Sequence, residues 1–338
     1  MSSLIAAVLF AGLADGAPPD VTAEPDGVTG HAADGPQRIV NGDREEDFPA
    51  TVSLGLMGFS MCTGSLITPR IVLTAAHCGD GLPIELVLAA GSIYVGTESA
   101  NPDHILAISD LIVHPDYVPL GGVPPIQTLP ENDVAVVVLA EDAPVDPIWF
   151  NTGRLGKKDL GETITSVGFG ITSGTGQVSG EKRSAKLTVD DVTDMFVMSD
   201  TVTNPDDAQI CSGDSGGPQY WKDPDTKQWI QWSVHSWGDA GCLIESGSTR
   251  TDVVKDFLFE QIESVHGTTD QCEINQRYDD GVCDASCAEF DVDCIKLSNF
   301  EDRPDLVSES QGGCETAPGG APMWLAGLMG LLAARRRE

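Results

Sequence analysis

The chain has 338 residues, which allows one large or two ordinary domains together with terminal extensions. Its formal net charge is −33, from 52 Asp and Glu against 19 Lys and Arg, and this balance excludes the basic footprint of a nucleic-acid-binding protein. We interpret the acidic surface as a feature that reflects the habitat of the organism. The alternative is that the negative charge steers cationic substrates toward the protein.

The first 17 residues form an apolar run that ends in small residues, the pattern of an export signal. The run is too short to span a bilayer, although it lacks the usual basic residue near Met1. We therefore predict a signal peptide over 1–17 and an exported protein, secreted or held at the cell surface or outer membrane. Residues 18–37 are rich in Pro, Gly, Asp and Ala and cannot build a core, so they are predicted to be a disordered leader.

From Thr51 the chain has the pattern of short β-strands separated by Gly and Pro. The expected strands are 51–56, 65–67, 70–74, 84–88, 104–113, 133–139, 162–167, 185–189 and 229–234. Residues 121–130 are rich in Gly and Pro and are expected to form a loop. One amphipathic helix is expected over 252–265. This pattern indicates an all-β fold of the sandwich or barrel type.

The clearest chemical motif is the octapeptide CSGDSGGP at residues 211–218. Its glycines allow a sharp turn and close approach of a substrate to the backbone. Ser215 can act there as a nucleophile while neighbouring N–H groups face a substrate carbonyl oxygen. Because serine alone is a weak nucleophile, this interpretation needs a general base and a residue that orients the base.

Both partners are present upstream of Ser215. His77, in LTAAHC at residues 73–78, is the candidate base, because imidazole exchanges protons near neutral pH. Asp133 opens a run of apolar or small residues and is expected to be partly buried. A buried carboxylate needs a partner, and an imidazole N–H is a suitable one.

Five motifs in one order carry a resemblance to the trypsin/chymotrypsin family of serine proteases. They are IVNG at 39–42, TAAHC at 74–78, DVAV at 133–136, GDSGGP at 213–218 and SWG at 236–238. The resemblance covers residues 39–267, about two thirds of the chain. It implies two six-stranded antiparallel β-barrels with an active site between them, followed by a C-terminal helix.

The resemblance also implies a role for each matching residue. Ser215 matches the nucleophile, His77 the base and Asp133 the residue that fixes the imidazole tautomer. The N–H groups of Gly213 and Ser215 match the oxyanion hole. Substrate backbone would pair with Ser236, Trp237 and Gly238. The implied disulfides are Cys62–Cys78 and Cys211–Cys242, a sparse set that resembles bacterial members.

Activation by proteolysis is a further implication. Cleavage between Arg38 and Ile39 would free an α-ammonium group that pairs with the carboxylate of Asp214 and orders the oxyanion loop. We therefore predict a zymogen with an activation propeptide over 18–38, cut by a trypsin-like activating protease or by the enzyme itself.

Specificity departs from the trypsin pattern at Gln209, six residues before Ser215, where trypsin-like members carry Asp. A neutral amide offers hydrogen bonds but no countercharge for Lys or Arg. We expect an apolar or uncharged polar side chain before the scissile bond, with tryptic cleavage through Glu245 as the alternative. The function from another class is a protease-like binding or adhesion protein that has lost catalysis.

Residues 268–296 contain four of the nine cysteines among acidic residues and resemble an abbreviated Notch-type repeat. The cysteines are expected to form two disulfides in one of three pairings, and zinc is disfavoured by export. They are Cys272, Cys283, Cys287 and Cys294. Carboxylates that suit calcium are Asp280, Asp284, Asp291 and Asp293, with disulfides and no metal as the alternative. Catalysis itself is expected to need no cofactor.

The C-terminal tail, 312–338, combines Gly313-Cys314, an apolar segment and terminal arginines. It resembles the sorting tails of myxobacterial surface proteins, in which the cysteine, here Cys314, is processed by sorting machinery. The alternative is a simple tail anchor with its end in the cytoplasm. Residues 297–311 are polar and are predicted to be a linker.

Overall fold

A computed structural model of the chain describes residues 42–123, 126–171, 180–281, 287, 289 and 291–292. Several sequence predictions lie outside these residues: the signal peptide 1–17, Arg38, Ile39, the linker 297–311 and the tail with Cys314. Cys283, Cys294, Asp284 and Asp293 also lie outside them. Within the described part of the chain, no helix is long and apolar enough to cross a membrane.

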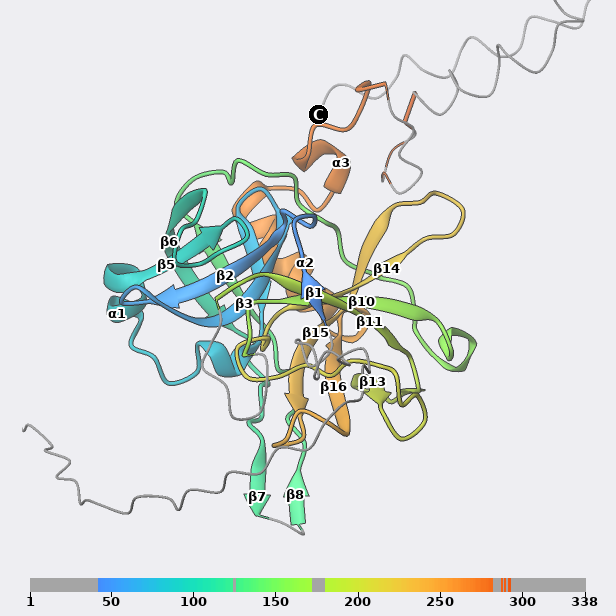
Figure 1. The fold of residues 1–338 in the computed structure, drawn as a ribbon. Coiled ribbons are helices and arrows are strands. Elements are labelled where there is room, and N and C mark those ends of the chain that lie inside the picture. The colour runs from blue at the N-terminus through green and yellow to red at the C-terminus, as the bar shows by residue number, and fades with distance from the viewer. Residues whose placement is uncertain are drawn as a thin grey trace, which may run out of the picture. The chain divides into compact units, whose positions relative to one another are not determined.

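The first half of the described chain forms a closed antiparallel barrel of six strands (Figure 1). In hydrogen-bonded order the strands are β2 (Thr51–Leu56), β3 (Phe59–Thr68), β4 (Ile71–Thr74), β9 (Ala135–Leu139), β6 (His104–Val113) and β5 (Gly91–Val95). Val52, Leu66, Val72 and Val137 point into its core, because alternate residues of a strand face the same side.

Two local predictions in this half were wrong. The expected strand at 84–88 is helix α1 (Ile84–Ala90), which begins after Pro83 and buries only Val87. Leu, Glu and Ala favour a helix, and one buried residue is too few to produce the alternation of buried and exposed residues that marks a strand. The expected loop at 121–130 contains a hairpin of β7 (Gly121–Val123) and β8 (Ile126–Thr128). Within the described residues these strands pair only with each other, and the Gly and Pro content of the segment had indicated a loop.

The second half forms an eight-stranded antiparallel sheet instead of the expected second six-stranded barrel. Its order is β1 (Asp43–Arg44), β11 (Arg183–Thr188), β10 (Thr163–Gly168), β14 (Pro218–Lys222), β15 (Trp229–Gly238), β16 (Glu245–Arg250), β13 (Phe196–Asp200) and β12 (Asp191–Val192). The six inner strands are the longer ones, and two-residue strands extend the sheet at both edges. Hydrogen bonds among the described residues do not close this sheet into a barrel.

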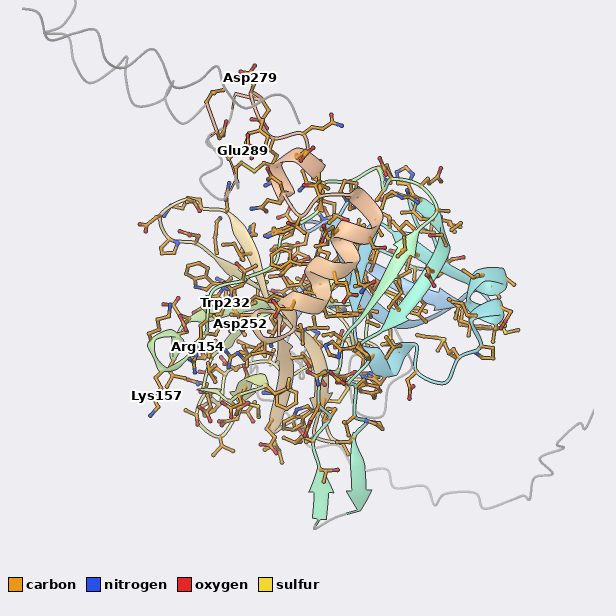
Figure 2. The ribbon with its side chains drawn as sticks, turned by 180° about the vertical axis from the view of Figure 1, so that it is seen from behind. Arg154, Lys157, Trp232, Asp252, Asp279 and Glu289 are labelled. Atoms are coloured by element: carbon orange, nitrogen blue, oxygen red, sulfur yellow. A yellow bond between two sulfur atoms is a disulfide. The ribbon has the colours of Figure 1, made fainter. Side chains whose placement is uncertain are left out.

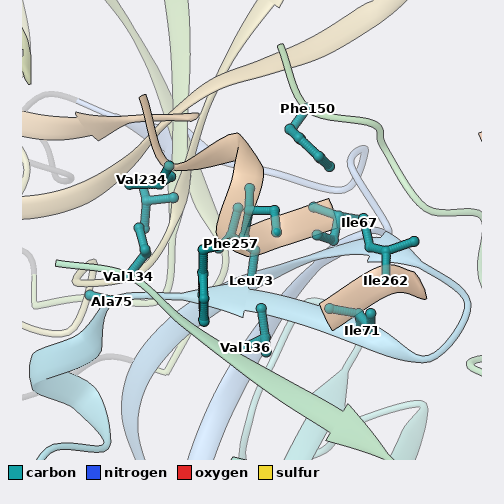
Figure 3. Close-up of a cluster of buried hydrophobic side chains, with 12 residues drawn as sticks. Ile67, Ile71, Leu73, Ala75, Val134, Val136, Phe150, Val234, Phe257 and Ile262 are labelled. Atoms are coloured by element: carbon teal, nitrogen blue, oxygen red, sulfur yellow. The ribbon is translucent and has the colours of Figure 1, made fainter. Parts of the chain in front are cut away.

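Helix α2 (Thr251–His266) confirms the helix expected at 252–265. It ends at Gly267, whose φ of 75° is the left-handed conformation that suits a helix C-terminus. Phe257 and Ile262 pack against Leu73 of the barrel and Val234 of the second sheet (Figure 3). The helix therefore joins the two halves through one apolar cluster. Figure 2 shows α2 from behind, with Asp252 in its first turn.

Three disulfides stabilise the described chain. Cys62 bonds to Cys78, and Cys211 bonds to Cys242. In the Cys-rich segment, Cys272 of the short helix α3 (Gln271–Ile274) bonds to Cys287, which selects one of the three pairings left open by the sequence.

Candidate active site

His77 and Asp133 meet at one end of the first barrel. His77 lies in the short helix η1 (Ala76–Cys78) directly after β4, and Asp133 lies just before β9. Because Thr74 of β4 pairs with Ala135 of β9, the two flanking loops leave the barrel side by side. The His77 Nδ1 atom lies 2.8 Å from Asp133 Oδ2, and the His77 backbone N–H donates to Oδ1 at 3.0 Å.

Asp133 has a third donor that sequence analysis did not predict. Ser236 was expected only to pair with substrate backbone, but its hydroxyl donates to Asp133 Oδ2 at 2.6 Å. The Asp133 side chain is only 1% exposed, so these bonds are shielded from water. Donation from Nδ1 to a fixed carboxylate leaves the Nε2 atom of His77 free to accept a proton.

Ser215 lies in the loop before β14 and is attached to the barrel that carries His77. The Thr63 N–H of β3 donates to the Ser215 carbonyl at 2.9 Å. The Thr63 hydroxyl donates to the Gly213 carbonyl at 2.8 Å and accepts the Phe169 N–H at 3.0 Å. The Ser215 hydroxyl makes no hydrogen bond to His77 in the described chain, a bond that often tightens only when substrate binds.

Glycine is required beside the candidate nucleophile. A Cβ atom on Gly216 would lie 2.1 Å from Thr74 Oγ1 and 2.4 Å from the Thr63 carbonyl oxygen. The φ angles of Gly213 and Gly216, 94° and 81°, lie in the left-handed region that favours glycine. The N–H groups of Gly213 and Ser215 donate no hydrogen bond within the described residues, so both are free for a substrate oxygen.

Asp214 is fully buried directly before Ser215. Its carboxylate accepts the N–H groups of Gly170 and Cys211, both at 2.9 Å. A Cβ atom on Gly168 would lie 2.1 Å from Asp214 Oδ1, so this strand position also requires glycine. Burial raises the pKa of Asp214 to about 7. No cationic group of the described chain pairs with it.

His235 of β15 is a fully buried histidine near the Ser215 loop, and sequence analysis gave it no role. Its Nδ1 atom lies 3.0 Å from the Asp214 carbonyl oxygen, and its Nε2 atom lies 3.1 Å from Ser166 Oγ. Burial lowers the pKa of His235 to about 4, so the imidazole is neutral at physiological pH.

A cavity of about 170 Å³ opens beside Ser215. The residues that line it are Ile210, Cys211, Ser212, Ser215, Ser236, Trp237, Gly238, Asp239, Ala240 and Cys242. Glu245 is exposed and is not among them, contrary to the alternative that placed its carboxylate in the pocket. Gln209 directly precedes this lining and is 1% exposed, and neither of its amide atoms has a hydrogen-bond partner within the described chain.

Asp239 organises the wall of this cavity, which the sequence did not indicate. Its carboxylate accepts the N–H groups of Gly241, Leu243, Ile244 and Glu245 at 2.7–3.2 Å. Burial opposes ionisation, but these four donors hold the pKa of Asp239 below its ordinary value. The four hydrogen bonds to the Asp239 carboxylate thus come from its own loop. The disulfide between Cys242 and Cys211 anchors this loop.

The predicted calcium ligands are only partly described. Asp291 is buried and Asp280 is exposed, while the other two carboxylates lie outside the described residues. Within the described part of the chain, the one group of side chains close enough to hold a metal is Cys62, His77 and Cys78, and its cysteines form a disulfide. Calcium binding therefore stays a prediction.

Comparison with known proteins gives a consistent family assignment. The family model described as Trypsin matches residues 39–258. A trypsin-like protease of Streptomyces glaucescens is 30% identical over 227 residues, covering 63% of this chain and 76% of the relative. A venom serine protease of Polistes dominula is 28% identical over 228 residues, covering 61% and 78%. Serine protease 56 of Mus musculus is 28% identical over 248 residues, covering 67% and 39%.

Proposed function

The chain belongs to the trypsin family of serine peptidases, and from this membership we propose an exported endopeptidase that cleaves proteins through an acyl-enzyme on Ser215. The observation that carries the proposal is the contact of 2.8 Å between His77 Nδ1 and the buried carboxylate of Asp133, beside a serine loop bonded to the same barrel.

The proposed reaction assigns each group one step. His77 Nε2 accepts the Ser215 proton as Oγ attacks the peptide carbonyl carbon, and Asp133 stabilises the imidazolium that forms. The N–H groups of Gly213 and Ser215 bind the developing oxyanion, each contributing about 3 kcal/mol of transition-state stabilisation. His77 then protonates the leaving amine, and water hydrolyses the acyl-enzyme by the same proton path.

The proposal includes activation by cleavage between Arg38 and Ile39. Arg183 donates to the Gly42 carbonyl at 3.4 Å and pairs across the sheet with Gly168, which lies against the Asp214 carboxylate. Three residues, 39–41, connect Gly42 to the new N-terminus and span roughly 10 Å when extended. The proposal pairs the α-ammonium of Ile39 with Asp214, a buried carboxylate that has no cationic partner among the described residues.

Substrate choice is proposed to exclude Lys and Arg before the scissile bond. The supporting observations are the neutral Gln209 behind the cavity wall and the engagement of Asp239 by four N–H groups of its own loop. A neutral pocket gives a cationic side chain no compensation for its lost hydration. Profiling a peptide library with the cleaved enzyme would test this, and preference for Lys or Arg would contradict it.

Export, the Cys-rich module at 268–296 and surface sorting through Cys314 also belong to the proposal. Three disulfides in the described chain are typical of an oxidising compartment. The proposed partners are protein substrates, an activating protease and the sorting machinery of the tail.

The competing proposal is a binding protein without catalysis. The test is labelling of the chain, cleaved at Arg38–Ile39, with a fluorophosphonate, followed by a peptidase assay. We expect labelling and hydrolysis in the native protein and neither in Ser215→Ala. Full activity in Ser215→Ala would refute the acyl-enzyme, and an unreactive native protein would favour the binding protein.

A further inference from the structure

His235 makes three bonds to the loop that presents Ser215. The imidazole Nδ1 contacts the Asp214 carbonyl at 3.0 Å. The backbone N–H of His235 donates to the Gly217 carbonyl at 2.8 Å, and its backbone carbonyl accepts the Gly216 N–H at 2.8 Å. The side chain is fully buried between this loop and β10. The imidazole therefore bonds to the nucleophile loop from behind, on a face that water does not reach.

The tautomer of His235 follows from its two partners. A carbonyl oxygen can only accept, so the Nδ1 atom must carry the proton that bonds to Asp214. The Nε2 atom then accepts a hydrogen bond from the Ser166 hydroxyl, which can donate. Of the two neutral tautomers, only this one satisfies both ring nitrogens, and burial favours the neutral imidazole over the imidazolium.

The bonded carbonyl belongs to the peptide group between Asp214 and Ser215. That group is planar and trans, so the direction of its C=O determines the direction of its N–H. The N–H is that of Ser215, which donates no hydrogen bond in the described chain and is a proposed oxyanion donor. A hydrogen bond to the C=O also polarises the amide and strengthens its N–H as a donor.

We propose that His235 is a positioning residue that aims and polarises the Ser215 N–H toward the oxyanion of the transition state. This inference rests on the proposed peptidase function and adds a second histidine to it. His235 touches neither the substrate nor the reacting atoms. It acts through one peptide group, so its effect belongs to the chemical step and not to substrate binding.

Two amide substitutions separate this role from simple core filling. In His235→Asn, the side-chain NH₂ can take the place of Nδ1–H near the Asp214 carbonyl. In His235→Gln, the amide reaches the Nε2 position near Ser166 and leaves the carbonyl without that donor. Both variants bury one amide, so a role limited to packing predicts similar activity for the two.

The experiment measures kcat and KM for one peptide amide substrate, using native and variant proteins cleaved at Arg38–Ile39. We expect His235→Gln to lose roughly 10- to 100-fold in kcat with KM unchanged within about twofold, the range of a weakened oxyanion donor. His235→Asn should keep kcat within about threefold. Equal kcat values for the two variants, or a loss confined to KM, would overturn the inference while leaving the native peptidase activity intact.

The matched control is His266→Gln. His266 is also bonded to a hydroxyl, Thr68 Oγ1 at 2.9 Å, but it is half-buried and lies in the last turn of α2. Its kcat should equal that of the native protein. A measurement that leaves His235 in place protects against His235 variants that fail to fold. The ¹⁵N NMR spectrum of the folded Ser215→Ala protein at pH 7 should show His235 protonated at Nδ1 and unprotonated at Nε2. A proton on Nε2 would overturn the inference.

Discussion

The backbone N–H of Thr63 donates to the carbonyl of Ser215 at 2.9 Å, and this bond connects the two halves of the active site. Thr63 belongs to the barrel that carries His77 and Asp133, whereas Ser215 lies in the loop that leads into β14 of the second sheet. Catalysis by groups from two separate sheets requires the loops that carry those groups to keep a fixed position relative to each other. Four testable predictions follow from how individual side chains hold these loops.

Thr63→Val should lower both stability and activity. The substitution removes the hydroxyl that bonds Gly213 and Phe169, and it leaves a buried carbonyl and a buried N–H with fewer partners. We expect a loss of about 1–3 kcal/mol in the free energy of unfolding and a lower kcat. Urea unfolding and steady-state kinetics provide the measurements. Thr51→Val, which removes a buried bond to Tyr220, is the control and should lose stability while keeping kcat.

Asp133→Asn should reduce kcat by about 10⁴-fold, because an amide stabilises the wrong tautomer of the base. Ser236→Ala removes the 2.6 Å bond to Asp133 Oδ2 and should cause a smaller reduction, about tenfold. Kinetic assays of the activated proteins test both values. Asp116 is exposed in the turn that follows β6, and Asp116→Asn should leave kcat unchanged. An equally low activity in Asp116→Asn would indicate general damage to this loop.

In the uncleaved precursor, the contribution of Asp214 to stability should fall as the pH rises from about 4 to about 7. Asp214 has its pKa raised to about 7 by burial, so the folded state binds a proton over a range in which the unfolded carboxyl has lost it. A proton that only the folded state binds stabilises that state more at the acidic end of this pH range. His235, with its pKa lowered to about 4, acts in the opposite direction between about 4 and 6.5.

Because the two groups oppose each other, the test compares precursors that differ only at Asp214. Urea unfolding of Ser215→Ala and of Asp214→Asn/Ser215→Ala should show the acid-favouring contribution only in the first protein. Cleavage at Arg38–Ile39 should abolish that contribution, since an ammonium partner keeps the carboxylate ionised. Identical pH profiles before and after cleavage would contradict the proposed pairing.

Asp239→Ala should raise KM by about tenfold or more with little change in kcat. The carboxylate holds the N–H groups of the loop that forms one wall of the cavity, and removing it leaves those donors without partners. A mobile wall weakens substrate binding without altering the reacting groups. Asp223→Ala is the control, since Asp223 likewise accepts N–H groups in a turn, between β14 and β15. An equal KM change in both variants would contradict the prediction.

Much of the fold was predictable wherever one face of a strand or helix is apolar and buried. Strands such as 70–74 and 133–139 and the helix at 252–265 have this pattern, and the structure has elements at each of these places. Strand β16 was missed because its sequence, ESGSTR, is polar although five of its six residues are buried. Its neighbours on both sides, β15 and β13, bury it through backbone pairing.

The candidate site divides in the same way. The sequence by itself determined the chemical types and the order of His77, Asp133 and Ser215, together with the glycines that allow the backbone of the serine loop to turn. Those features are local, because each motif carries its own residue types and spacing. They were sufficient to indicate nucleophilic catalysis by serine.

Only the tertiary structure decided which side chains support those groups. Ser236, Thr63 and His235 are ordinary strand residues in the sequence, yet they contact Asp133, Gly213 and Asp214 across the sheets. Asp239 likewise holds its loop only in the folded chain. The physical reason is that these bonds depend on strand register and on exclusion of water, and both arise only when the chain has packed. The Ser236–Asp133 and Thr63–Gly213 bonds join residues more than a hundred positions apart.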